Sequence, residues 1–552
     1  MYIRLKTSKK AKHPTLQIVE GVRKGDKVRQ RTVAHLGVIK SKQDLERLKD
    51  LADKLIQRLE KEGLQLDPKI EVKKLRHKQT VYDGFRIVLE RLMALTGFTN
   101  IVRLARGRHR FDIEETVKLI LAQRFDLPSS KLRTFERQEE HGFTGIDLQH
   151  VYRTMDAIEP FVDEIQKQAF IAAQKASGEQ VDCIFFDVTT LYFESIVQDE
   201  IREFGFSKDQ KHHQVQIVLA LVVDSNGLPI AYDAFKGNLA ETKTLIPVLE
   251  ALRNRFSIKN ITVICDRGMA SVANVEALQG AAFQFVIATK LRSMSKSLKI
   301  NDLSTYSDLY QQESPEEDDK VLVRTMAHPQ YKDTLLIATY SSARARKDND
   351  DRDRLIEKLR KKLSGDVEEA SIKKIISNSG YKKFTDVQKG SAIKIDEGAI
   401  DEDALWDGFH GIAVSNGSKM SVHEALSRYR DLWRVEEAFR VAKCTLRARP
   451  IFHWTPHRIR SHILLCFMSL FLERFLELLL RRNETNLTPD RIRHALAQVH
   501  TIFFDDGSEG SEGKMPSALT KDAEQIFRVL GITNERRATT ESNVVPEFFF
   551  HK

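Results

Sequence analysis

The chain has 552 residues, 41% of them hydrophobic and 30% charged, a length that predicts several domains instead of one core. Its 88 basic and 78 acidic residues give a net charge of +10, which is compatible with a polyanionic partner without requiring one. The four cysteines lie far apart with no C-x-x-C pair, which argues against a zinc site or a disulfide framework and fits a reducing cytoplasm. The longest apolar run, Ile463–Leu480, contains Glu473, Arg474 and Glu477, so we expect a buried helix and no membrane span. The polar start of the chain predicts no secretory signal.

The first forty residues alternate apolar and polar side chains and are rich in lysine and arginine, which predicts a small, basic, β-rich module. Two interpretations have equal weight: a clamp for DNA phosphates and a solvated hairpin. A helix follows from Ser41 to Gly63, with Ser41 as its cap, and a charged extended piece covers Lys69–Lys78. We take residues 1–80 as the first domain.

Residues 81–178 predict a mainly helical region. Helices are expected at Tyr82–Leu95 and Ile113–Arg124 and again from Pro160 to Ala176, with a polar, turn-rich segment from Pro128 to Asp156. The pattern contains no clear helix-turn-helix. A role in binding DNA ends is the functional interpretation of this region.

Two aspartates follow short apolar runs that are typical of buried strands. Asp187 stands in CIFFDVTTLYFES and Asp266 in ITVICDRGMAS, and we expect each at the end of its strand. Each aspartate alone is weak evidence for a functional site, because aspartate often caps a turn or helix. Further elements are expected between and after them: strands Gln214–Val223, Pro229–Phe235 and Phe283–Ala288, and the helix Lys243–Arg253.

A third carboxylate lies on a predicted helix, Tyr429–Lys443. An apolar stripe is formed by Leu432, Val435, Phe439 and Ala442, and the other faces present Glu436 among cations. An amphipathic helix with a charged surface is the simpler interpretation. Three converging carboxylates would suit a hard divalent cation such as Mg²⁺.

These residues together resemble a known family. Tyr429, Glu436 and Lys443 occupy three positions of a Y-x2-R-x3-E-x6-K motif, and Leu432 stands where the motif has arginine. The chain is therefore similar to the DDE transposases of bacterial insertion sequences, in the insertion-sequence-four-like superfamily, with Asp187 and Asp266 at its other two acidic positions. The segment starting GFSKDQKHHQ and the stretch RARPIFHW extend the resemblance. Arg430 or Arg434 would replace the missing arginine.

The resemblance implies a mixed α/β fold with a ribonuclease H-like catalytic core at residues 179–290 and 408–485, interrupted by an insertion domain at 291–407. Within the insertion we expect strands near Val321–Met326 and Thr334–Tyr340 and helices at Asp351–Leu363 and Val367–Ile376. The insertion would brace the active site and touch DNA near the cleaved end. The strand Gly411–Val414 would return to the core.

Residues 486–552 complete the expected organisation. They predict a helix at Pro489–Val499, a Gly/Ser/Glu linker at 505–514, a short helix ending near Leu530, and a C-terminal tail. One hypothesis is that the phenylalanines of this tail dock against a partner subunit.

The resemblance also implies the chemistry. Asp187, Asp266 and Glu436 would hold two Mg²⁺ ions, with Mn²⁺ as a substitute, and drive in-line phosphoryl transfer at the end of a mobile DNA element. The freed 3′-hydroxyl would then be joined to target DNA. Expected partners are terminal inverted repeats, target DNA and a second subunit in the synaptic complex; the expected location is the bacterial cytoplasm, at the nucleoid when DNA-bound. The expected DNA contacts are Tyr429, Lys443, Arg440, Arg434 and Trp433, although Trp433 beside an apolar stripe is more often core.

Two other functions use the same residues. A metal-dependent nuclease without strand transfer would have identical acids, and an inactive transposase-derived DNA-binding protein is disfavoured because all three acids are present. Neighbouring His212 and His213 are a poor metal pair and fit a basic loop facing DNA. Asp182 and Asp209 are further acids outside the family pattern.

Overall fold

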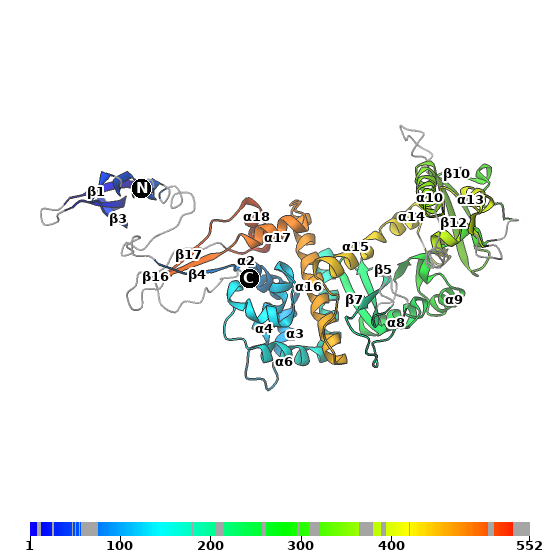
Figure 1. Ribbon diagram of the computed structural model, residues 1–552, viewed down its shortest axis with the longest axis horizontal. Coiled ribbons are helices and arrows are strands. Elements are labelled where there is room, and N and C mark those ends of the chain that lie inside the picture. Colours follow the sequence, from blue (N-terminus) through cyan, green and yellow to red (C-terminus); the bar gives the residue numbers. More distant parts are fainter. Residues whose placement is uncertain are drawn as a thin grey trace.

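The computed structural model describes residues 1–7, 13–24, 27–42, 44–46, 48–49, 51–53, 56, 76–178, 180–205, 213–256, 261–294, 298–309, 321–363, 379–387, 393–418, 420–505 and 513–533. The molecule is elongated, with residues 1–38 at one end and the strands and helices of residues 298–415 at the other (Figure 1). Within the described residues, none of the helices combines the length and hydropathy that a membrane crossing requires.

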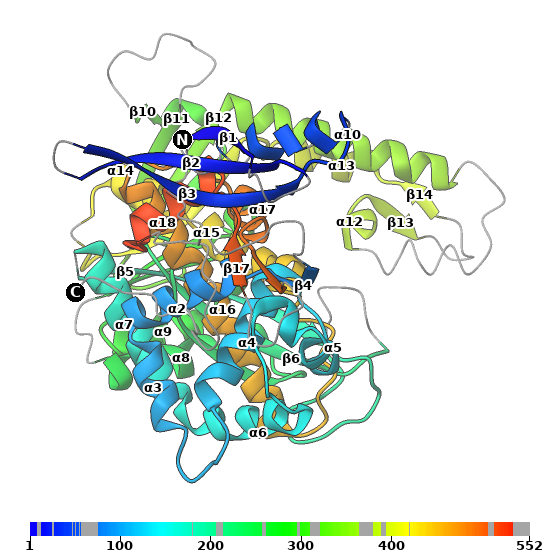
Figure 2. The same cartoon turned by 90° about the vertical axis from the view of Figure 1, so that its left-hand side faces the viewer.

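The N-terminal module is a three-stranded antiparallel sheet of β1 (Tyr2–Lys6), β2 (Thr15–Lys24) and β3 (Lys27–Val38), seen as a twisted ribbon in Figure 2. Its alternating pattern places Leu16 and Ile18 in a small core separate from the main one. Helical residues after Ser41 cover that core, and the Asp44 amide donates to the Ser41 hydroxyl at 3.1 Å. The predicted β-rich module and its capping serine are confirmed.

The helical region contains the expected helices and three that were not expected. Its helices are α2 (Gly84–Thr96), α3 (Phe98–Leu104), α4 (Ile113–Asp126), α5 (Lys131–Glu136), α6 (Leu148–Ile158) and α7 (Val162–Ser177). The prediction of a turn-rich segment from 128 to 156 was wrong, because α5 and α6 lie there. Capping explains both: Ser130 accepts the Arg133 amide, and Asp147 forms a capping box with His150.

The strands expected to form the core belong to a nine-stranded sheet, in the order β10-β11-β12-β15-β9-β8-β5-β6-β7. Its core strands are β5 (Cys183–Tyr192), β6 (Gln216–Asp224), β7 (Pro229–Lys236), β8 (Thr262–Cys265) and β9 (Gln284–Thr289). The first three are antiparallel, β8 and β9 are added in parallel, and α8 (Leu245–Phe256) and α9 (Val272–Gly280) connect them. This order is that of a ribonuclease H-like core, as predicted.

The segment between the second aspartate and Glu436 adds strands to the same sheet. Its elements are β10 (Ser307–Asp308), β11 (Val321–Ala327), β12 (Thr334–Ser341), α10 (Ser342–Leu363), α12 (Ser379–Lys382), β13 (Thr385–Val387), β14 (Ile393–Ile395) and α13 (Glu397–Ala404). The returning strand β15 (Phe409–Ser415) pairs with both β12 and β9, which joins this segment to the core. The helix expected at 351–363 begins nine residues earlier, and the helix expected at 367–376 lies outside the described residues.

The single helix predicted at 429–443 was wrong. The structure has α14 (Val422–Arg430), a turn, α15 (Trp433–Arg440) and a π-helical turn at Val441–Thr445. The Leu432 amide donates to the Tyr429 carbonyl, and the Arg434 amide donates to the Asp431 carbonyl. Each bond joins residues three positions apart instead of four, so the backbone is wound more tightly there than in an α-helix. The apolar stripe is buried as predicted, because α15 packs on β5 and β6.

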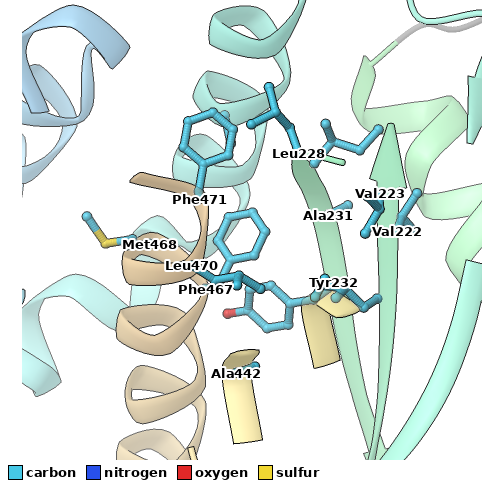
Figure 3. Close-up of a cluster of buried hydrophobic side chains, with 14 of the residues drawn as sticks. Val222, Val223, Leu228, Ala231, Tyr232, Ala442, Phe467, Met468, Leu470 and Phe471 are labelled. Carbon is cyan, nitrogen blue, oxygen red and sulfur yellow. The ribbon is translucent and has the colours of Figure 1, made fainter. Parts of the chain in front are cut away.

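The long helix α16 (Pro456–Arg482) runs through the centre of the molecule and is buried along most of its length, as expected. Figure 3 shows its residues Phe467 and Phe471 facing β6 and β7, where the Phe467 and Tyr232 ring centroids lie 5.0 Å apart. Its charged residues are paired: Arg474 with Glu477 at 2.7 Å, and Glu473 with Arg493.

The C-terminal part pairs with residues from the start of the chain. The helices α17 (Pro489–Ala497) and α18 (Lys521–Leu530) flank β16 (Thr501–Asp505) and β17 (Gly513–Pro516), and β16 also pairs with β4 (Arg76–Val81). The prediction that 505–514 is only a linker was therefore wrong at its ends, which belong to paired strands. The C-terminal phenylalanines lie outside the described residues.

Candidate active site

The two aspartates lie side by side on neighbouring parallel strands. The last registered pair between β5 and β8 is Phe186 with Cys265, so Asp187 and Asp266 take the next position on each strand. Residues at matching positions of parallel neighbours point to the same face. Asp266 ends its strand as predicted, but Asp187 does not, because β5 continues to Tyr192 and pairs there with β6.

Both aspartates also lie near the thiol of Cys265. Burial raises the pKa of the Cys265 thiol, and the charges of Asp266 and Asp187 raise it further. Asp187 is half-buried and Asp266 is exposed at this edge of the sheet.

Tyr429 lies near both Asp266 and the third acid, Glu436. Burial raises the pKa of its hydroxyl, and the negative charges of Asp266 and Glu436 both add to that rise. Its ring meets His410 edge-on at a centroid distance of 5.1 Å. Burial lowers the pKa of His410 to about 4, so this imidazole is neutral at pH 7.

Glu436 is exposed on α15, whose buried stripe rests on β5 and β6. The helix that carries Glu436 therefore packs on β5, the strand that carries Asp187. Among the described residues, however, no group of three His, Cys, Asp or Glu side chains is close enough together to hold an ion. Their oxygen donors are the kind that magnesium and manganese prefer.

Comparisons with known proteins decide the family. Residues 180–472 match the family described as "Transposase DDE domain", and residues 3–68 match "IS1634 family transposase, N-terminal domain". The chain is a DDE transposase of the bacterial insertion-sequence type. It is thus a DNA transposase, a DNA-binding enzyme of a family that depends on divalent metal.

Solved structures give weaker likenesses. A piggyBac transposase synaptic complex with hairpin DNA is similar over 75% of this chain and 78% of that chain, with 10% identity and a TM-score of 0.35. A Mos1 transposase paired-end complex with the left transposon end is similar over 32% and 59%, with 11% identity and a TM-score of 0.15. Both scores are low, so the family assignment rests on the sequence matches. A search of curated proteins finds no match to the chain.

Two of the five predicted DNA-contacting residues of this transposase, Trp433 and Arg440, are exposed, and the other three are half-buried. Trp433 is 49% exposed, so the core interpretation of this residue was wrong. Arg434 pairs with Asp431 at 3.3 Å, and Arg440 pairs with Glu437 at 3.4 Å while its side chain stays 69% exposed. The other two, Tyr429 and Lys443, are half-buried.

Leu432, at the motif's arginine position, is buried in the core with 6% exposure. Of the two proposed replacements, Arg430 is exposed and Arg434 is half-buried with its guanidinium 5.2 Å from the Trp433 ring centroid. Both flank the turn between α14 and α15.

A cleft that sequence reasoning missed opens beside Asp266 and Tyr429. It holds about 1080 Å³, and its lining includes both basic and acidic side chains. The basic residues are Arg267, Lys290, Arg292, Arg344, Arg352 and Lys383, and the acidic ones are Asp266, Asp348, Asp351, Asp403 and Asp407. The available signal was the position of two of these cations beyond core strands: Arg267 follows Asp266 after β8, and Lys290 comes directly after β9.

The cations of the cleft divide into two groups. Arg292 and Lys383 share Asp403, Arg352 pairs with Asp407 at 2.5 Å, and Arg344 pairs with Asp348 at 3.7 Å, so each cation of the far wall has an acidic partner. Within the part of the chain that the structure describes, Arg267 and Lys290 have no ion-pair partner. The side nearest Asp266 therefore keeps positive charge.

The remaining predicted residues lie away from this centre or outside the description. His213 is exposed before β6, and His212 and Asp209 are outside the described residues. Asp182 pairs with Arg428 of α14 at 3.3 Å.

Proposed function

We propose that Asp187, Asp266 and Glu436 are the metal-binding catalytic acids of this transposase. The observation that carries the proposal is that Asp187 and Asp266 take matching positions on β5 and β8. Glu436 lies near the same place, because its charge and that of Asp266 both act on the Tyr429 hydroxyl. The three carboxylates would hold two Mg²⁺ ions, or Mn²⁺ in substitution. When bound, such ions supply activation of the attacking oxygen and stabilisation of the leaving oxygen.

The chain's own residues would hold the DNA. Tyr429, Lys443, Arg434 and Arg440 would contact phosphates near the scissile bond, and exposed Trp433 would stack on an unpaired base. Charged contacts of this kind supply sequence-independent affinity and fix register. The three-position match to the Y-x2-R-x3-E-x6-K motif supports an insertion-sequence-four-like member.

The proposed substrate is the terminal inverted repeat of an insertion sequence. Water breaks the phosphodiester at the element end and leaves a 3′-hydroxyl. That hydroxyl then attacks a target phosphodiester, forming one P–O bond as another breaks. Two subunits would pair two ends, in the bacterial cytoplasm at the nucleoid.

The proposed division of labour follows the expected domains. The N-terminal sheet (residues 1–80) and the helices of 81–178 would bind element ends, and residues 291–407 would brace the catalytic edge through β15.

A cleavage and joining assay tests the proposal. Labelled DNA from the repeats that flank the gene is incubated with Mg²⁺ or Mn²⁺ and wild type, Asp187→Ala or Glu436→Ala. Wild type should nick and join, while both variants bind DNA with activity reduced about a thousandfold or more. Asp209→Ala is the matched control, because this acid lies outside the family pattern.

Variants as active as wild type would refute the assignment of the acids. Nicking without joining would favour a nuclease, and binding without nicking by wild type would favour an inactive derivative.

A further inference from the structure

The loop after the catalytic helix, residues 446–454, is held rigidly and has no role in the proposal above. Arg124 of α4 donates to the Leu446 carbonyl at 2.6 Å, and His462 Nε2 of α16 lies 3.0 Å from the Ala448 carbonyl. The Ile451 amide donates to the Tyr192 carbonyl at 3.2 Å. The backbone is thus anchored to two helices and to the end of β5.

A second set of contacts fixes the outer part of the loop. Ile451 forms a β-bridge with Phe193, and Arg202 donates to the Trp454 carbonyl at 3.3 Å. The Arg202 guanidinium also lies 5.7 Å from the Trp454 ring centroid. Such preorganisation lowers the entropy lost on binding a partner.

The anchored loop presents two aromatic side chains to solvent. Phe452 and Trp454 are each 63% exposed, although Ile451, directly before Phe452, is buried. The neighbouring segment after β5 adds the exposed side chains of Ile196 and Val197. An apolar patch on an ordered surface marks an interaction site.

The loop carries a positive charge that would attract a polyanion such as DNA. Arg447 is exposed and has no ion-pair partner within the described residues. Two nearby acids are paired, Asp199 with Arg202 at 2.7 Å and Glu200 with Arg460 at 3.2 Å, whereas the exposed Glu194 beside Phe193 has no ion-pair partner among the described residues.

The attachment of the loop to β5 gives its distance from Asp187 along that strand. Tyr192, which binds the loop, is five residues beyond Asp187 on β5. At about 3.3 Å per residue this is about 17 Å along the strand. A duplex that spans it covers about 5 base pairs, at about 3.4 Å each.

We propose that loop 446–454 is a second DNA contact, which grips the duplex about 5 base pairs from the scissile phosphate. Phe452 and Trp454 pack on sugars and base surfaces in the minor groove, and Arg447 neutralises a phosphate. This inference rests on the proposed function, since it measures from a scissile phosphate at the acids.

A duplex-length series tests the loop. Full-length protein carrying Asp187→Asn, which keeps the DNA intact, is titrated with duplexes extended stepwise on each side of the scissile position. The same background receives Phe452→Ala with Trp454→Ala, or Leu104→Ala as a control of equal exposure (65%) on α3. The parent and the control should gain affinity, about tenfold or more, once one side exceeds about 5 base pairs, and the double variant should lose that gain.

Arg447→Ala should reduce the slope of log affinity against log salt by about 0.9. An unchanged length dependence in the double variant would overturn the inference, as would an equal loss on every length. Altered self-association with unchanged DNA affinity would assign the patch to protein and overturn it too. The length series reads binding alone, so failure of the cleavage assay would refute the proposed function separately.

Discussion

The two halves of the central sheet differ in how completely they are covered. In the inner half, β5 to β9, every residue of β6 is buried, because α15 and α16 pack across these strands (Figure 1). In the outer half, β11 is mostly half-exposed. The acids stand at the doubly covered half, where packing fixes their position, and the cleft with its cations opens where the halves meet.

The largest difference should appear in stability. Phe285→Ala on inner strand β9, where the side chain is fully buried, should cost about 3 to 5 kcal/mol of unfolding free energy through lost burial and a cavity. Leu322→Ala on half-exposed β11 should cost roughly 1 kcal/mol. Urea unfolding of both variants measures this, and equal losses would remove the contrast between the halves.

The next largest effect is expected from the ion pair that joins α16 to α15, the helix that carries Glu436. Arg474 is 3.1 Å from Glu437, the neighbour of Glu436, and 2.7 Å from Glu477. Arg474→Met leaves both carboxylates without it, so we expect about 3 kcal/mol of destabilisation and a loss of DNA cleavage with DNA affinity retained. Arg481→Met, at the exposed end of α16, is the control. Full cleavage by a destabilised Arg474→Met variant would show that the pair is only structural.

A buried base in the helical region should give a pH dependence. Burial and the charge of Arg124 together lower the pKa of Lys131 to about 7. Because the unfolded chain binds the extra proton between pH 7 and about 10.5, stability should rise across that window. The expected rise is on the order of 1 to 3 kcal/mol, and Lys131→Met should flatten it. An unchanged pH profile of unfolding in the variant would contradict the assignment.

The smallest effect is expected at the cleft. Lys290→Ala should weaken DNA binding several-fold and reduce its salt slope by about 0.9, because a phosphate contact is lost. Lys175→Ala, an exposed lysine on α7, should leave both unchanged. Equal effects of the two substitutions would mean that net charge alone governs binding.

Local sequence was sufficient to predict secondary structure wherever apolar residues recur with the period of a strand or a helix. The alternation of β1 to β3 and the apolar runs before Asp187 and Asp266 predicted their strands, and the stripe from Leu432 to Ala442 predicted its buried face. The same signals, with the motif around Glu436, indicated the ribonuclease H-like order.

Tertiary structure decided what depends on distant partners. Asp187 lies within a strand because β6 pairs beyond it, and β4 and β16 pair across more than four hundred residues. The outer strands joined the core sheet through β15, and the helix around Glu436 broke at Asp431 and Leu432. No local pattern encodes these outcomes, because strand pairing and the clustering of charges around a cleft depend on which surfaces meet after the chain has folded.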